Sequence, residues 1–147
     1  MTTAKQFRAF CQAVIGTWVG KRDTATARGE TVKAVWEATL DGAFLLEHWY
    51  TPGPDGRLQL SAIAMFQVAS GEPAGYVAAY RTGRVGLGDS TFARGEWVLS
   101  HRWLGAEPDA DIHLRLLDGR TYEQEVRVYG PGGRREPESR AVLVRED

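Results

Sequence analysis

The stretch Ile15-Gly16-Thr17-Trp18-Val19-Gly20-Lys21 separates a short apolar helix signal from a long run of strand-like sequence. Gly16 has no Cβ, so it allows the backbone to turn sharply out of a helix and to pack closely. A tryptophan two residues later, at the start of the first strand, can bury roughly 150–250 Å². We therefore expect Trp18 to fill one end of a closed β-barrel.

Composition describes an ordinary globular protein and excludes several classes of partner. The chain has 147 residues, 43% hydrophobic and 25% charged, which is typical of one domain, so we expect residues 1–147 to form a single domain. A net charge of −1 predicts neither nucleic acid nor a membrane as partner. The single cysteine, Cys11, excludes a disulfide within the chain, and no signal peptide or membrane-spanning segment is evident. We expect a cytoplasmic protein.

The segment from Ala4 to Ile15 has the periodicity of an amphipathic helix. Phe7, Phe10 and Val14 recur at spacings of three and four, and Thr2 or Thr3 is the expected N-cap. Such a helix would close one end of the barrel, with Cys11 as a small core residue rather than a reactive thiol.

After Trp18 the hydrophobic period changes to two, which predicts an all-β fold. Strands are predicted over residues 30–41, 43–51, 58–68, 75–81, 96–104, 111–117, 121–129 and 138–145. Turn signals such as Asp41-Gly42 and Gly130-Pro-Gly-Gly133 separate them, and the glycine-rich residues 83–88 predict a hairpin or bulged edge. Consecutive hairpins favour an up-and-down antiparallel β-barrel of about 8–10 strands, because closure removes exposed edges. A two-sheet sandwich is the alternative.

Several short motifs resemble the calycin superfamily of lipocalins, fatty-acid-binding proteins and nitrobindin-like barrels. Gly16-Thr17-Trp18 after a short helix carries this resemblance. An uncharacterised bacterial calycin-like family is similar over residues 40–45, the hairpin 66–80, and residues 122–133 with the terminal Arg145. The resemblance implies that an arginine of the last strand, Arg145 or else Arg140, covers Trp18, so that Gly16, Trp18 and Arg145 have structural roles. Nitrobindin-like haem proteins use a histidine late in the chain, whereas the last histidine here is His113.

The three histidines fall on different predicted strands and match no metal-ligand spacing. We predict no metal and no cofactor, with a haem on one histidine in the barrel mouth as the alternative. His113 alternates with Ile112 and Leu114 and is expected on the outer face.

Three titratable residues are the candidates for catalysis: His101, His48 and Glu47. His101 is in phase with Trp97, Leu99 and Trp103; on an interior face its burial would keep the imidazole neutral. By the same logic His48 shares a face with Phe44, Leu46 and Tyr50, and Glu47 shares one with Leu45 and Trp49. A buried glutamate has a raised pKa and suits acid–base chemistry. The simpler interpretation is that both histidines are wall residues with satisfied hydrogen bonds.

Aromatic side chains alternate with small ones along the predicted strands, and this pattern predicts a cavity. Large and small residues in phase leave room inside a barrel, and Ala34, Ala38, Ala62, Ala64 and Ala78 are the small ones. The expected ligand-binding residues are Trp36, Phe66, Tyr76, Tyr80, Trp97 and Trp103.

These patterns predict a protein that binds a small hydrophobic molecule, aromatic or polyketide-like, inside the barrel. Two alternatives stay open: an enzyme in the same pocket (a cyclase, isomerase or lyase), and a protein-interaction module with a filled core. A homodimer is a further partner that the sequence permits.

Overall fold

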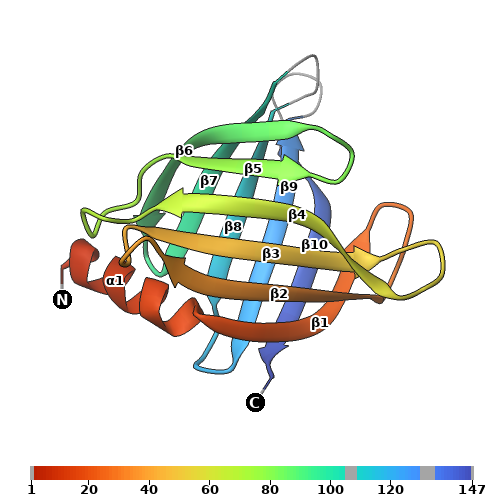
Figure 1. The fold of residues 1–147 in the computed structure, drawn as a ribbon, viewed down its shortest axis with the longest axis horizontal. Coiled ribbons are helices and arrows are strands. Elements are labelled where there is room, and N and C mark those ends of the chain that lie inside the picture. The colour runs from red at the N-terminus through yellow and green to blue at the C-terminus, as the bar shows by residue number, and fades with distance from the viewer. Residues whose placement is uncertain (1, 105–108, 130–134, 147) are drawn as a thin grey trace.

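The computed structural model describes residues 2–104, 109–129 and 135–146, which form a closed β-barrel with one helix (Figure 1). Helix α1 spans Thr3–Val14, and Thr2 is its N-cap. The strands are β1 (Gly16–Thr24), β2 (Glu30–Thr39), β3 (Phe44–Pro52), β4 (Leu58–Gln67), β5 (Tyr76–Tyr80), β6 (Val85–Ala93), β7 (Glu96–Trp103), β8 (Ala110–Leu116), β9 (Thr121–Tyr129) and β10 (Arg135–Arg145). The predicted turn at residues 130–133 lies outside the described residues.

The strands follow one another around the barrel in chain order. Each pairs antiparallel with the next, and β1 also pairs with β10, where Trp18 lies opposite Arg145. Each of the ten described strands therefore has two neighbours, as barrel closure requires. The predicted up-and-down antiparallel barrel is confirmed, and the two-sheet alternative is wrong.

Helix α1 closes one end of the barrel, at the lower left of Figure 1. Its buried residues Phe7, Phe10 and Val14 recur at the predicted helical spacing. The Phe7 ring centroid lies 5.4 Å from that of Phe92 and 5.1 Å from that of Trp97. Beneath the helix, large buried side chains form the closed end, which we call the floor: Trp18, Trp36, Phe66, Trp97 and Tyr122.

The end of α1 is fixed by donors from two strands. The Trp18 indole nitrogen donates to the Val14 carbonyl at 2.8 Å, and the Arg145 guanidinium donates to the carbonyls of Ala13 and Ile15. The Arg145 Cζ atom also lies 4.4 Å from the Trp18 ring centroid. The expected pair of Trp18 and Arg145 is thus present, whereas Arg140 donates to Glu123 instead.

Gly16 makes this junction possible. Its φ of +138° is a conformation that favours glycine, and a Cβ there would lie 2.5 Å from Arg145 Nη1. The predicted structural role of Gly16 therefore follows from both its backbone conformation and its neighbour.

Two positions of the β2 pattern depart from expectation. Val32, Ala34 and Trp36 are buried, but Ala38 is exposed at the end of the strand. Leu40, in phase with them, is 65% exposed in the following turn and has a φ of +51°. The alternating pattern therefore extends past Trp36, which is the last buried residue of β2. Ala38 consequently does not line the interior.

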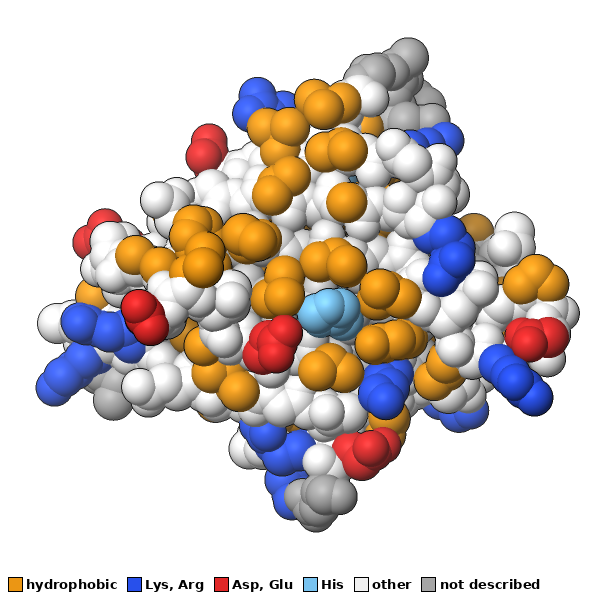
Figure 2. Space-filling model, in the orientation of Figure 1, with side chains coloured by type: hydrophobic (Ala, Val, Ile, Leu, Met, Phe, Trp, Pro, Cys, Tyr) orange, Lys and Arg blue, Asp and Glu red, His pale blue; other side chains and the backbone are white. Residues whose placement is uncertain are grey.

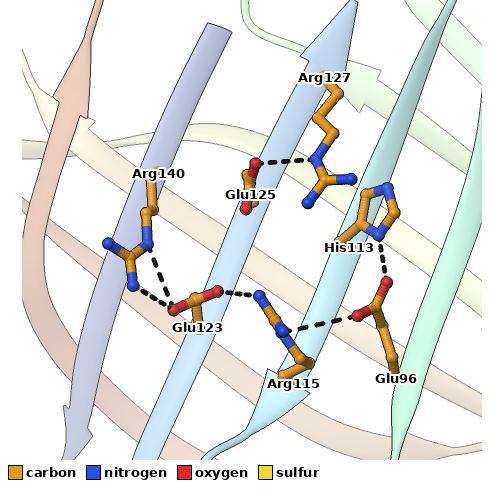
Figure 3. Close-up of polar contacts among 7 residues, drawn as sticks. All are labelled: Glu96, His113, Arg115, Glu123, Glu125, Arg127 and Arg140. Carbon is orange, nitrogen blue, oxygen red and sulfur yellow. Dashed lines mark hydrogen bonds and ion pairs between the residues drawn. The ribbon is translucent and has the colours of Figure 1, made fainter. Parts of the chain in front are cut away.

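The outer wall has two contrasting halves. Across β2, β3, β4 and β5 one register row places Val35, His48, Ile63 and Ala79 side by side. Figure 2 shows that hydrophobic side chains dominate the middle of this face. On β7 to β10 the outer wall instead carries polar and charged side chains joined by hydrogen bonds and ion pairs (Figure 3), and these are Glu96, His113, Arg115, Glu123, Glu125, Arg127 and Arg140.

Candidate functional site

The middle of the barrel is lined by small residues and encloses a cavity of about 140 Å³, the inner cavity. Ala62, Ala64, Ala78 and Ala141 leave this space between the strands. Toward the end opposite α1 the inner cavity adjoins a wider opening of about 590 Å³, the mouth, and residues such as Arg22 and Tyr80 line both. The barrel interior is therefore filled at the floor and hollow above it.

Glu47 is a buried carboxyl group in the wall of the inner cavity. It lies on β3 opposite Trp36 and Ala64 and is 7% exposed. Its Oε2 atom is buried without a hydrogen-bond partner among the described residues. Burial raises the pKa of Glu47 from 4.5 to about 8, because the apolar surroundings disfavour the charged form. Near neutral pH this group is mostly protonated and holds unused hydrogen-bonding capacity.

His101 lies on β7 between two tyrosines of β5. The Tyr76 hydroxyl is 2.6 Å from His101 Nδ1, and the Tyr80 hydroxyl is 3.5 Å from Nε2. The imidazole is 2% exposed, and burial lowers its pKa, an effect that the Asp109 charge opposes. A neutral imidazole has one donor and one acceptor nitrogen, so one tyrosine hydroxyl donates to the ring and the other accepts from it.

Glycine in β6 makes room for this imidazole. A Cβ at position 86 would lie 2.1 Å from His101 Cε1, and one at position 88 would lie 1.8 Å from the Ser100 carbonyl oxygen. The predicted hairpin is present, because the turn after Tyr80 joins β5 to the antiparallel β6, and both glycines belong to the start of β6. Gly86 is the sequence feature that could have indicated a buried side chain at His101 on the neighbouring strand.

The aromatic rings above His101 belong to the mouth. The Trp103 ring stands edge-on to His101 at 4.6 Å between centroids, and the Tyr80 ring lies 4.7 Å from Trp103. The strand β7 turns its odd-numbered residues inward, as its alternation predicts. His101 lies beside the mouth, because the floor takes up the part of the strand nearer α1.

The predicted ligand-binding residues divide by depth. Phe66, Tyr76 and Tyr80 line the inner cavity, and Trp103 lines the mouth. Trp36 and Trp97 lie instead in the floor. The Trp36 ring lies 5.2 Å from Phe66 and 6.3 Å from Trp97, between centroids. The sequence predicted that both indoles bind a ligand, but in the structure they fill the core.

His48 does not share the pocket with Glu47 and His101. Neighbouring residues of a strand point to opposite faces, and Glu47 points inward. His48 therefore lies on the outer wall beside Val35 and Ile63. The interior face considered for His48 is therefore not the one that it occupies, and a catalytic role for this residue stays a prediction from the sequence.

Arg22 is a site residue that the sequence analysis missed. It lies on β1, lines both the inner cavity and the mouth, and pairs with Glu30 at 2.5 Å. Its Nε is buried without a hydrogen-bond partner among the described residues. A signal for it exists in the sequence, because Arg22 is in phase with Trp18 and Gly20 on one strand.

Among the described residues no three His, Cys, Asp or Glu side chains lie together in a way that could hold a metal ion. Within that same part of the chain, no helix has the length and apolar character needed to cross a membrane. Cys11 packs against the core, and burial raises the pKa of its thiol.

Comparison with known proteins shows a shared fold. No protein-family model matches the chain, and no curated protein matches it. The crystal structure of Rv2717c from M. tuberculosis is similar, with a TM-score of 0.67 and 19% identity over 99% of this chain and 100% of that one. A redesigned β-barrel is similar with a TM-score of 0.50 and 12% identity, covering 93% of this chain and 95% of that one. At these identities the likeness shows that the chain folds as a small β-barrel.

Proposed function

We propose that this protein binds a small hydrophobic molecule, aromatic or polyketide-like, in the inner cavity and mouth. The carrying observation is the inner cavity itself, an enclosed space between aromatic rings beneath an open mouth. A cavity of about 150 Å³ lined by apolar side chains is known to accept benzene. The inner cavity is of that size, so it suits one ring, with the rest of the ligand in the mouth.

The polar groups suggest how such a ligand would be oriented. The contact between the Tyr80 hydroxyl and His101 is long at 3.5 Å, while that between Tyr76 and His101 is short at 2.6 Å. Tyr80 can therefore exchange its histidine contact for one with a ligand at little cost. Tyr76 and His101 would hold each other in place while Tyr80 meets the ligand.

Membership of the calycin superfamily is part of this proposal. The helix, Gly16 at the turn, and Arg145 stacked on Trp18 support it. A single-domain, cytoplasmic protein and a homodimer remain predictions from the sequence. The apolar outer wall of β2 to β5 is the surface on which a dimer would be sought.

Filling the inner cavity tests the proposal. Ala78 lines the inner cavity, whereas its neighbour Ala79 is exposed on the outer wall. We expect Ala78→Leu to abolish saturable quenching of tryptophan fluorescence by small apolar aromatic probes, and Ala79→Leu to leave it unchanged. Circular dichroism would establish that both variants fold. Equal binding by the two variants, or no binding by the unaltered protein to any probe, would contradict a ligand site in the cavity.

Glu47 favours an enzyme as the second candidate. A carboxyl group with a pKa of about 8 can exchange a proton near neutral pH, and it lies in the same cavity wall as Tyr76 and Tyr80. A cyclase, isomerase or lyase would need such a group beside its substrate. If the protein converts any compound to a product, Glu47→Gln should lower kcat for that reaction by orders of magnitude. A binding protein would convert none of the compounds.

A further inference from the structure

We infer that the ligand carries a basic nitrogen and that Glu47 binds it as a cation inside the inner cavity. This inference rests on the proposed function, and it assigns the chemical class of the molecule that enters. It is drawn from the carboxyl group of Glu47, the aromatic rings around it, and the charge state of every other titratable group nearby.

Glu47 has hydrogen-bonding capacity that the described residues do not use. A buried carboxyl oxygen without a hydrogen-bond partner carries a desolvation cost that a donor from the ligand would remove. Arg22 lines the same cavity, but it pairs with Glu30 at 2.5 Å, and its buried Nε makes no hydrogen bond to Glu47 Oε2. The carboxyl group of Glu47 therefore remains available to a donor that the protein does not supply.

Glu47 lines the inner cavity together with several aromatic rings. Rings of Trp49, Phe66, Tyr76 and Tyr80 line the same cavity. The faces of aromatic rings attract cations, most strongly where water is excluded. A carboxylate within an aromatic enclosure is thus complementary to an ammonium or amidinium group, and it stabilises such a group by charge as well as by contact.

Glu47 is the acidic side chain lining the inner cavity that can become charged near neutral pH. Tyr76 and Tyr80 of β5 and Tyr122 of β9 all have pKa values raised by burial, so they stay neutral. Burial keeps His101 of β7 neutral as well. Arg22 of β1 is neutralised by Glu30 of β2. Glu138 of β10 lines the mouth but not the inner cavity, so a cation in the inner cavity would find its counter-ion at Glu47.

Proton balance gives this inference a distinct signature. The protonated carboxyl group meets an ammonium ion, the O–H bond breaks, and the proton leaves for solvent as the carboxylate pairs with the cation. Because burial raises the pKa of Glu47 to about 8, the group is mostly protonated at pH 7, so binding releases most of one proton. A neutral ligand of the same shape would release none.

The experiment compares benzylamine with toluene and benzyl alcohol, by titration calorimetry in buffers of different ionisation enthalpy. We expect benzylamine to bind at least tenfold more tightly than toluene and to release a proton. Glu47→Gln should weaken benzylamine by about 30-fold or more, abolish the release, and leave toluene unchanged. Glu37→Gln, an exposed position on β2, is the matched control and should alter neither ligand.

The outcomes separate the two proposals. If toluene binds but benzylamine binds no more tightly, or if Glu47→Gln leaves benzylamine affinity unchanged, the cation inference is overturned and the ligand cavity stands. If none of the three probes binds, the cavity proposal fails and the inference fails with it. If Glu47→Gln does not fold, the unaltered protein gives the answer. Its affinity for benzylamine should rise nearly tenfold from pH 6 to pH 7 and less steeply toward pH 8, and a flat profile contradicts the inference.

Discussion

Glu47 is the residue at which this barrel departs most from a simple apolar core. Its neighbours in the cavity wall are alanines and aromatic rings, and one of its oxygens has no partner among the described residues. Burying an ionisable group in this way costs folding free energy unless the group becomes neutral. The barrel therefore holds a carboxylic acid whose charge is coupled to folding.

The coupling has a definite sign. In the unfolded chain a glutamate has a pKa of about 4.3, and in the folded barrel the pKa of Glu47 is about 8. Between these values the folded state binds the proton and the unfolded state does not, so the free energy of unfolding falls as pH rises from about 4 to 8, by at most ~1.4 kcal/mol per pH unit. Urea unfolding of Glu47→Gln from pH 5 to 8 should give a flatter dependence. Parallel curves for variant and unaltered protein would contradict the raised pKa.

At the level of elements, α1 depends on a residue at the far end of the chain. Arg145 of β10 donates to two carbonyls at the end of the helix and stacks on Trp18 of β1. The last carbonyls of a helix lack partners within it, so outside donors stabilise that end. One side chain thus joins the helix, the first strand and the last strand at the point where the barrel closes.

Removing this side chain should loosen the closed end. We expect Arg145→Ala to lower the free energy of unfolding by about 2–4 kcal/mol, since it removes hydrogen bonds from a charged donor and the contact with an indole ring. Arg57→Ala is the control. Its side chain is 89% exposed, so it should cost far less. Urea titrations measure both, and equal losses would show that stacking on Trp18 contributes nothing.

Seen as a whole, the molecule has a polar half and an apolar half on its outside. Glu123 lies at the centre of the charged half, 3% exposed, with Arg115 at 2.6 Å and Arg140 at 2.7 Å (Figure 3). The apolar half over β2 to β5 is the face of Figure 2. Ion pairs at this depth stabilise a fold only while both partners are charged.

The charged half should make the whole barrel sensitive to acid. Burial acts to raise the pKa of Glu123, but hydrogen bonds from Arg140 and Arg115 outweigh it and hold the pKa below its usual value. This stability is therefore present above about pH 4.3 and is lost as pH falls through the lower folded pKa. Glu123→Gln should cost about 2–3 kcal/mol at pH 7 and much less at pH 3, measured by urea unfolding. The exposed Glu72→Gln should cost nothing at either pH, and a loss at pH 3 equal to that at pH 7 would argue against the ion pairs.

Much of the fold could be predicted from the sequence alone. The period of α1, the alternation along each strand and the turn residues between strands are local features, and they determined the order of elements and the inward face of β7. The pair of Arg145 and Trp18 could also be expected, from a resemblance to known barrels. These features depend on neighbours in the chain, which a sequence displays directly.

Only the tertiary structure decided where the hollow lies and what surrounds it. Trp36 and Trp97 meet in the floor at 6.3 Å between ring centroids, Arg22 and Tyr80 line the same cavity from β1 and β5, and β3 turns Glu47 inward and His48 outward. Alternation says that two neighbours differ in face, but not which of them faces the core when both strand faces are partly apolar. The depth of a side chain, the cavity it lines and the residues it contacts depend on strands that are distant in sequence. The local periodicity of the sequence does not show which of these strands come together.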